Sequence, residues 1–222
     1  MVAMTEIRPM QRTDLAAACD VLGLAFADNP NALAVTRGDR ARAARLMRAG
    51  ARLGKLGRAA ATVLVAERAG QVVGVLNAAP WPRCQFSAAE QLRLAPRMIV
   101  LLGTRLPRAV TAPRVMAGHD PRQPHWHIGP IGVRPDQQGQ GIGRRLLTAF
   151  LAKVDAERMP AFLETDVARN VLLYQSFGFE TIARARIHDV DNHFMWRAGQ
   201  ADSRFSRPTA SASSRRWRSS SG

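Results

Sequence analysis

The 222-residue sequence predicts a mixed α/β fold built around a central sheet, and three observations lead to this. Two apolar runs, 62–67 and 71–79, flank the turn residues 68–70 and predict a β-hairpin. An apolar strand over 125–133 runs into a Gly-rich turn, and a helical pattern over 141–158 follows at once. Strand and helix patterns alternate along the rest of the chain, which is typical of helices packed on a sheet.

The remaining elements follow from periodicity and turn residues. Residues 13–15 (Thr-Asp-Leu) indicate a capped helix start, and apolar residues then recur every three or four positions as far as Phe26. Asp28-Asn29-Pro30 is expected to end this helix. The other expected elements are a strand over 5–8, a very basic helix over 39–59, a helix over 87–103, a Pro-broken loop up to Pro124, a strand over 161–165, a helix over 168–177, and closing strands over 180–190 and 193–197.

Basic residues outnumber acidic ones by 32 to 17, which gives a formal net charge of +15. The excess lies in residues 37–58, 83–114 and 200–222, and the rest of the chain is close to neutral. A basic chain suits nucleic acid, a membrane surface or an anionic ligand. No nucleic-acid-binding motif is visible, and no apolar run approaches the roughly 20 residues that span a bilayer. We therefore expect no specific nucleic acid and no membrane partner.

The composition also bounds organisation and compartment. Two cysteines, Cys19 and Cys84, cannot form a disulfide framework, and the N-terminus has no apolar signal region, so a cytoplasmic protein is expected. Residues 1–199 are expected to form one domain. Residues 200–222 are rich in Ser, Ala and Arg without apolar periodicity, which predicts a disordered basic tail. Oligomeric state stays open between a monomer and a homodimer.

The Gly-rich turn at residues 138–143, Gln-Gly-Gln-Gly-Ile-Gly, is the most informative segment. Glycines let successive backbone N–H groups converge, and a helix N-terminus adds partial positive charge, so the turn can cradle a pyrophosphate. Arg144 adds formal charge at the first helical turn. The glycine spacing matches neither a P-loop nor a dinucleotide fingerprint. A tight strand-to-helix connection without a ligand is the alternative.

A second motif follows the Ala-Phe-Leu-Glu-Thr strand at 161–165: Arg169-Asn170, then Tyr174 and Gly178-Phe179. Together the two motifs resemble the GNAT superfamily of acyl-CoA-dependent N-acetyltransferases. Residues 25–30 (Ala-Phe-Ala-Asp-Asn-Pro) and 161–165 make the chain similar to puromycin N-acetyltransferase-like members. The resemblance implies a mixed, mostly antiparallel sheet that splays after its fourth strand and is flanked by helices.

The resemblance also implies where acetyl-CoA, as cosubstrate, would bind. It would lie between the strands at 125–133 and 161–165, and pair with the first of them as an added strand does. Tyr174, one helical turn after Asn170, would be the general acid that protonates the departing thiolate. The residues implied in cofactor binding are Ile131, Gly132, Val133, Gln138, Gly139, Gly141, Ile142, Gly143, Arg144 and Asn170.

The acceptor amine must lose a proton, so a base is expected. Counting eleven and thirteen residues back from Gln138 gives His127 and His125, positions that carry the base in some members of the family. We expect His127 to act directly or through water, with Glu164 as the rival base. Phe26, Asp28, His125 and Trp126 are the candidate substrate-binding residues.

No metal is expected, because the pair His125-x-His127 has no cysteine nearby in the sequence. The predicted function is transfer of an acetyl group from acetyl-CoA to a primary amine of a small molecule, by direct attack. A protein or peptide amine is an alternative acceptor. A basic nucleic-acid-binding protein and a non-catalytic acyl-CoA sensor on the same scaffold are the alternative functions.

Overall fold

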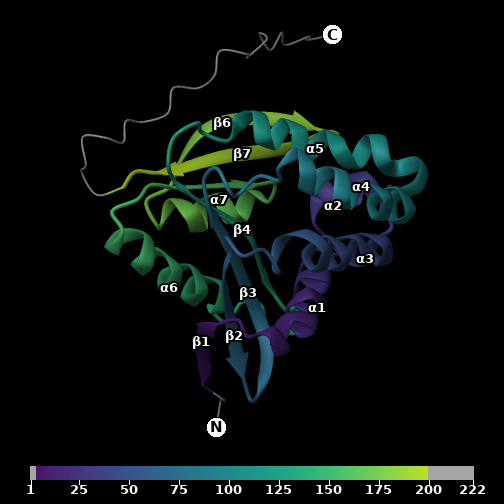
Figure 1. Ribbon diagram of the computed structural model, residues 1–222. Coiled ribbons are helices and arrows are strands. Elements are labelled where there is room, and N and C mark those ends of the chain that lie inside the picture. The colour runs from purple at the N-terminus through teal and green to yellow at the C-terminus, as the bar shows by residue number, and fades with distance from the viewer. Residues whose placement is uncertain (1–3, 200–222) are drawn as a thin grey trace, which may run out of the picture.

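A computed structural model describes residues 4–199 and shows a twisted sheet with helices on both faces (Figure 1). The predicted tail lies outside the described residues. No helix within the described range is long and apolar enough to cross a membrane. The elements are β1 (Thr5–Pro9), α1 (Leu15–Ala25), α2 (Pro30–Thr36), α3 (Arg40–Gly50), β2 (Thr62–Arg68), β3 (Gln71–Pro80), α4 (Ala88–Leu102), α5 (Leu106–His119), β4 (Trp126–Val133), α6 (Ile142–Ala156), β5 (Ala161–Thr165), α7 (Ala168–Gln175), β6 (Glu180–Ile187) and β7 (Val190–Arg197).

The seven strands form one sheet in the order β1-β2-β3-β4-β5-β7-β6. Every neighbouring pair is antiparallel except β4 and β5, which run parallel. These two strands pair at only two positions, Trp126 with Ala161 and His127 with Phe162, and then separate. The sheet is therefore mostly antiparallel and opens after its fourth strand, which confirms the predicted fold class.

A bulge in β4 sets which side chains face which side of the sheet. Leu76 pairs with Ile131 and Ala78 with Ile128, so two residues of β4 lie opposite Asn77 of β3. The Asn77 amide donates to the Gly129 carbonyl at 2.9 Å and holds the bulge. The extra residue shifts the alternation, and Ile128 and Ile131 both pack in the core beside α6.

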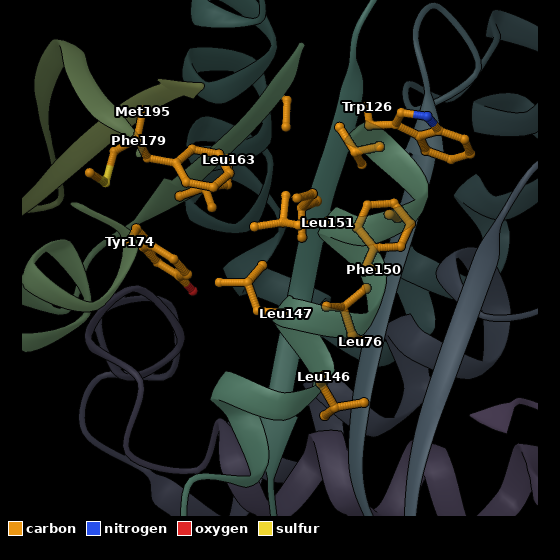
Figure 2. Packing of buried hydrophobic residues seen from close by; sticks show 14 of the residues in the cluster. Leu76, Trp126, Leu146, Leu147, Phe150, Leu151, Leu163, Tyr174, Phe179 and Met195 are labelled. Carbon is orange, nitrogen blue, oxygen red and sulfur yellow. The ribbon is translucent and has the colours of Figure 1, made fainter. Parts of the chain in front are cut away.

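The core divides between the two faces of the sheet. On one face α6 lays Leu147 and Phe150 against Trp126 and Leu163 of the sheet (Figure 2). On the other face α1 packs closely on β4, where a Cβ at Gly132 would lie 2.9 Å from Leu22. A third cluster around Phe162, Phe194 and Trp196 includes Met116 of α5. The helices before β4 thus cover the face opposite α6 (Figure 1).

Prolines account for two differences from the sequence prediction. The expected Pro-broken loop is wrong: residues 106–119 form α5, with one proline in the first turn and Pro113 inside the helix. A first-turn proline loses no hydrogen bond, because that amide has no partner within the helix. The second difference is α2, an element that the sequence did not predict and that begins at Pro30. Asn29 caps this helix, because its side chain accepts from the Ala32 amide at 3.0 Å.

Three further details differ from the sequence prediction: a helix cap, the division of a helix and the start of a strand. Asp14 makes no capping bond to α1, because its carboxylate pairs with Arg8 at 2.6 Å. The basic helix is divided into α3 and a π-helical turn over Ala51–Lys55. The last strand begins at Val190, three residues before the expected start.

Candidate active site

The unpaired part of β4 forms one wall of the candidate site. Beyond His127, β4 pairs with β3 through Ile131, Gly132 and Val133, but has no strand hydrogen-bonded on its β5 side within the described residues. An extended ligand could therefore add to this edge as a strand does. The opening begins at His127, the last residue of β4 that is paired with β5.

The Gly-rich turn closes the far end of this edge. Gly139 and Gly141 adopt φ angles of +77° and +75°, and a Cβ at either position would meet no atom within 4 Å. Backbone conformation, rather than space, therefore requires glycine there. Gly141 is the N-cap of α6, so no side chain occupies the amides of its first turn. Gln138 donates to the Val133 carbonyl at 3.0 Å and ties the turn to β4.

Arg144 connects the Gly-rich turn with α7 on the other side of the opening. Its guanidinium lies 5.0 Å from the centre of the Phe177 ring and donates to the Ser176 hydroxyl at 3.3 Å. The Arg144 side chain is exposed, as are Gln138 and Gly139. The turn thus presents backbone amides and one cation to solvent beside α7.

Tyr174 lies on α7, one turn after the half-buried Asn170. It is 8% exposed, and its ring contacts Phe179 edge-on at 6.1 Å. The ring extends from α7 towards Leu147, with its hydroxyl leading (Figure 2). Burial, with the Glu164 and Asp166 carboxylates, raises the pKa of Tyr174 to about 12. The phenol is therefore a protonated group at neutral pH.

His127 lies between two carboxylates. Its Nε2 is 2.9 Å from Oε2 of Glu164, and its Nδ1 is 3.6 Å from Oδ1 of Asp120. Burial alone would lower the pKa of His127, but the charges of Glu164 and Asp120 raise that pKa well above its ordinary value. The His127 and Glu164 side chains are each about one fifth exposed, so the pair is accessible at the start of the opening.

Behind His127 a buried cluster has formed around Asp120. The Nε2 atom of His125 lies 3.0 Å from Oδ1 of Asp120, and both side chains are almost fully buried. Oδ2 of Asp120 accepts from Gln85 at 2.7 Å and from the Cys84 thiol at 3.4 Å. Burial opposes ionisation of Asp120, yet His125 and His127 hold the pKa of this carboxyl below its ordinary value.

Sequence similarity and fold agree on the family. The model of the Acetyltransferase (GNAT) family matches residues 34–179. The chain belongs to the GNAT acetyltransferase family. It is therefore an acetyl-CoA-dependent N-acetyltransferase.

Solved GNAT structures share the fold at low identity. The structure described as histone acetyltransferase HPA2 and related acetyltransferase, from Corynebacterium glutamicum, matches with a TM-score of 0.64 and 21% identity, over 91% of this chain and 99% of that one. A Brucella melitensis GNAT acetyltransferase in complex with acetyl-CoA matches at 0.51 and 19%, over 94% of each chain. The Escherichia coli ribosomal-protein-S18-alanine N-acetyltransferase matches at 0.52 and 16%, over 96% of this chain and 99% of that one.

The structure separates the four candidate substrate-binding residues of this GNAT protein. Phe26 lies beside β4, with one ring carbon 3.6 Å from a Cβ built at Gly132. Asp28 is exposed and forms an ion pair with Arg40. His125 is fully buried in the Asp120 cluster. None of these positions is on the face that carries Trp126.

Trp126 lies away from His127, on the α6 face of the acetyltransferase sheet. Its ring contacts Phe150 edge-on at 5.4 Å, and its Nε1 donates to Glu157 at 2.6 Å. Only 7% of this residue is exposed. The alternation of side chains along a strand accounts for the separation, because neighbouring residues point to opposite faces. We therefore assign Trp126 to the core and give it no part in the site.

Three residues of the GNAT site were not singled out by sequence reasoning. Cys84 enters the sequence prediction only as one of two cysteines that cannot form a disulfide framework, and Asp120 lies in the segment predicted to be a loop. The argument against a metal is wrong on one point, because folding brings Cys84 to the histidine pair. Asp166 holds the connection between α1 and α2, by accepting from the Asn29 amide at 2.8 Å and the Asn31 backbone at 2.9 Å. Its place in the Asp-x-x-x-Asn motif was the available signal.

The basic segments of the acetyltransferase meet around a cavity of about 390 Å³. Arg42 and Arg45 line it from α3, and Arg105 lines it from the α4–α5 junction. The remaining wall comes from α2 and the end of α4. Positive charge from both internal basic segments is thus gathered on the side of the protein that carries the helices before β4.

Proposed function

We propose that this acetyltransferase transfers the acetyl group to a primary amine of a small molecule by direct attack. The observation that supports this most is the arrangement at the opening of the sheet. Tyr174 lies on α7 and the His127–Glu164 pair lies where β4 and β5 part, so a donor and an acceptor of protons flank the unpaired edge of β4.

In this mechanism the amine nitrogen bonds to the thioester carbon and the C–S bond breaks. The His127–Glu164 pair takes the proton that the nitrogen loses, directly or through water, and the Tyr174 hydroxyl gives its proton to the departing sulfur. The protein forms no covalent intermediate. The high pKa of Tyr174 keeps its hydroxyl protonated before the transfer, and it also makes the phenol a weaker acid than an exposed tyrosine.

The proposed cofactor site uses the backbone of β4 and the N-terminus of α6. Backbone groups of Ile131, Gly132 and Val133 would pair with the pantetheine arm, and Asn170 would bond it from α7. The amides from Gly139 to Arg144, Ile142 and Gly143 included, would hold the pyrophosphate. Gln138 would shape this turn, since its amide already bonds the Val133 carbonyl.

The proposed acceptor is a small amine that is neutral or carries an anionic group. The arginine-lined cavity repels polycations such as polyamines, since it gathers three guanidinium groups. The motifs at 25–30 and 161–165 support the puromycin N-acetyltransferase-like branch, so puromycin belongs in the substrate panel. We propose that the enzyme acts in the cytoplasm, as a monomer or homodimer, with no specific nucleic acid as partner.

Calorimetry with acetyl-CoA tests the cofactor site. We expect Gly141→Glu to abolish saturable binding, because it puts a carboxylate and a strained backbone at the pyrophosphate cradle. Gly38→Glu is the matched control: Gly38 also has a positive φ, of +85°, with open space around it, but lies between α2 and α3. Equal binding by the two variants would refute the cradle.

A thiol-release assay with puromycin, amino acids, peptides and polyamines then identifies the acceptor. Release with peptides alone would overturn the small-molecule proposal.

A further inference from the structure

Four side chains from three segments converge near the start of β4, and one of them is His127 of the catalytic pair. Cys84 comes from the turn after β3, Asp120 directly follows α5, and His125 and His127 come from the start of β4. Each offers one ligand atom, and the four atoms all lie within 4.8 Å of one another. Cys84 and His127, which are 43 positions apart in the sequence, thus meet in one cluster, in which Asp120 and His125 are buried and Cys84 and His127 are half-buried.

Three atoms of this cluster lack hydrogen-bond partners. Among the residues that the structure describes, Oδ1 of Asp120, Nε2 of His125 and Nδ1 of His127 are buried without one. The two nitrogens lie 3.0 and 3.6 Å from Oδ1, but not in the geometry of a hydrogen bond. Buried polar groups are nearly always satisfied, so an occupant that bonds these three atoms would satisfy the cluster.

The tautomer of His125 points to a cation as that occupant. Its Nδ1 lies 2.7 Å from the carbonyl oxygen of Gln123, and a carbonyl can only accept, so Nδ1 carries the hydrogen. In the neutral ring the Nε2 lone pair then faces the carboxylate of Asp120, and either a second ring proton or a metal ion between them would remove this repulsion. A metal ion between the two atoms would turn this repulsion into two bonds.

We propose that Cys84, Asp120, His125 and His127 bind a zinc ion. One thiolate, one carboxylate and two imidazoles are ligands that zinc takes, with bonds of about 2.0–2.3 Å. A tetrahedron with such bonds has edges of about 3.3–3.8 Å. Around Oδ1 of Asp120, the 3.6 Å to Nδ1 of His127 is of this size and the 3.0 Å to Nε2 of His125 is slightly shorter. The Cys84 sulfur lies 3.4 Å from the other oxygen, Oδ2.

The charges and the outer contacts of the cluster also suit zinc. Binding releases the thiol proton of Cys84, and the thiolate and the Asp120 carboxylate then balance the two positive charges of the ion. The carbonyl of Gln123 holds the Nδ1–H of His125, and Glu164 faces Nε2 of His127 at 2.9 Å. A carboxylate or carbonyl behind each histidine is the usual outer shell of a zinc site.

The zinc site would link the two ends of the segment between β3 and β4 that contains α4 and α5, called here the α4–α5 excursion. Cys84 lies just before α4, and Asp120 just after α5, so one ion would tie both ends of the α4–α5 excursion to β4. Zinc on Nδ1 also leaves the remaining His127 proton on Nε2, facing Glu164. In the zinc-loaded enzyme Glu164 is then the member of the catalytic pair that accepts a proton.

Metal analysis of the full chain, prepared without chelator or histidine tag, tests the proposal. We expect about one zinc per chain after dialysis against limiting zinc, and an affinity at least tenfold weaker in Cys84→Ala. Cys19→Ala is the matched control, because Cys19 is the other cysteine and lies buried in α1. It should bind zinc as the wild type does.

Two further measurements distinguish a bound zinc ion from protons that are shared among the four side chains. Chelation should lower Tm by several degrees, and zinc but not magnesium should restore it. Cobalt substitution should give a thiolate-to-metal absorption band that Cys84→Ala lacks. Zinc contents well below one per chain, or equal zinc affinity in Cys84→Ala and the wild type, would overturn the proposal. Acetyl-CoA binding does not involve these four residues, so its retention shows that the proposed cofactor site survives such a result.

Discussion

Replacing Tyr174 by phenylalanine tests the proposed proton donor with the least change to the fold. The substitution removes one hydroxyl and leaves the ring on Phe179. We expect acetyl-CoA affinity to stay the same and turnover to fall about 10²-fold, which corresponds to about 2.7 kcal/mol of lost transition-state stabilisation. Steady-state kinetics by thiol release measures this. Turnover equal to that of the wild type would remove Tyr174 from the mechanism.

The wild type allows the pKa of Tyr174 to be read directly, because Tyr174 is the chain's one tyrosine, and Tyr174→Phe serves as the blank. Ultraviolet absorbance should show phenolate forming with a midpoint near pH 12 in the folded protein, against about 10 in the unfolded chain. About one phenol in a thousand is ionised at pH 9, so Tyr174 should cause no alkaline loss of activity there. A folded-state midpoint near 10 would refute the argument from burial.

The raised pKa also makes stability depend on pH. The folded state favours the neutral phenol, so this contribution is fully present below about pH 10 and is lost as the pH rises towards 12. A shift of two pKa units corresponds to about 2.7 kcal/mol of unfolding free energy. Urea unfolding at pH 9 and pH 11 should show part of this loss in the wild type and none of it in Tyr174→Phe.

Two acidic residues give the remaining predictions. Asp166→Ala should lower the unfolding free energy by about 1.5–3 kcal/mol in urea, because the bond from the Asn31 amide to a charged partner is lost. It should also raise the KM of the amine more than that of acetyl-CoA. Glu164→Gln should reduce turnover about 10²-fold at unchanged acetyl-CoA affinity, since it removes the carboxylate beside His127. Asp20→Ala, at an exposed position of α1, is the control for both and should change stability by at most about 1 kcal/mol and leave the kinetics unchanged.

Local patterns predicted most of the fold. The hairpin of β2 and β3, the strand-turn-helix unit of β4 and α6, and the closing strands follow from short-range alternation and turn residues. α5 was missed because proline signals a helix break, although tertiary contacts and a first-turn position tolerate it here. α2 was missed because Asn29-Pro30 was taken as an end, and the same residues also cap and start a helix.

The candidate site was predicted where its residues are neighbours in sequence. The residues of the turn at 138–143 are consecutive, and Asn170 and Tyr174 both lie on α7, where spacing alone indicates their shared face. The cluster around Asp120 depends on how the α4–α5 excursion returns to the sheet, which no local pattern encodes. The position of Trp126 on the other face could have been predicted, since it lies between His125 and His127 and neighbouring residues of a strand point to opposite faces.

The proposed cofactor site is easier to predict from the sequence than the proposed acceptor site, because the two recognise their ligands in different ways. The proposed cofactor half binds with backbone groups of β4 and α6, which any sequence with the right turn and strand presents. That is consistent with a shared fold at 21% identity or less. The proposed acceptor half uses side chains on α2, α3 and the α4–α5 excursion, where the two internal basic segments gather around a cavity. Positive charge therefore bears on which amine approaches, while the acetyl-transfer chemistry belongs to the nearly neutral remainder of the chain.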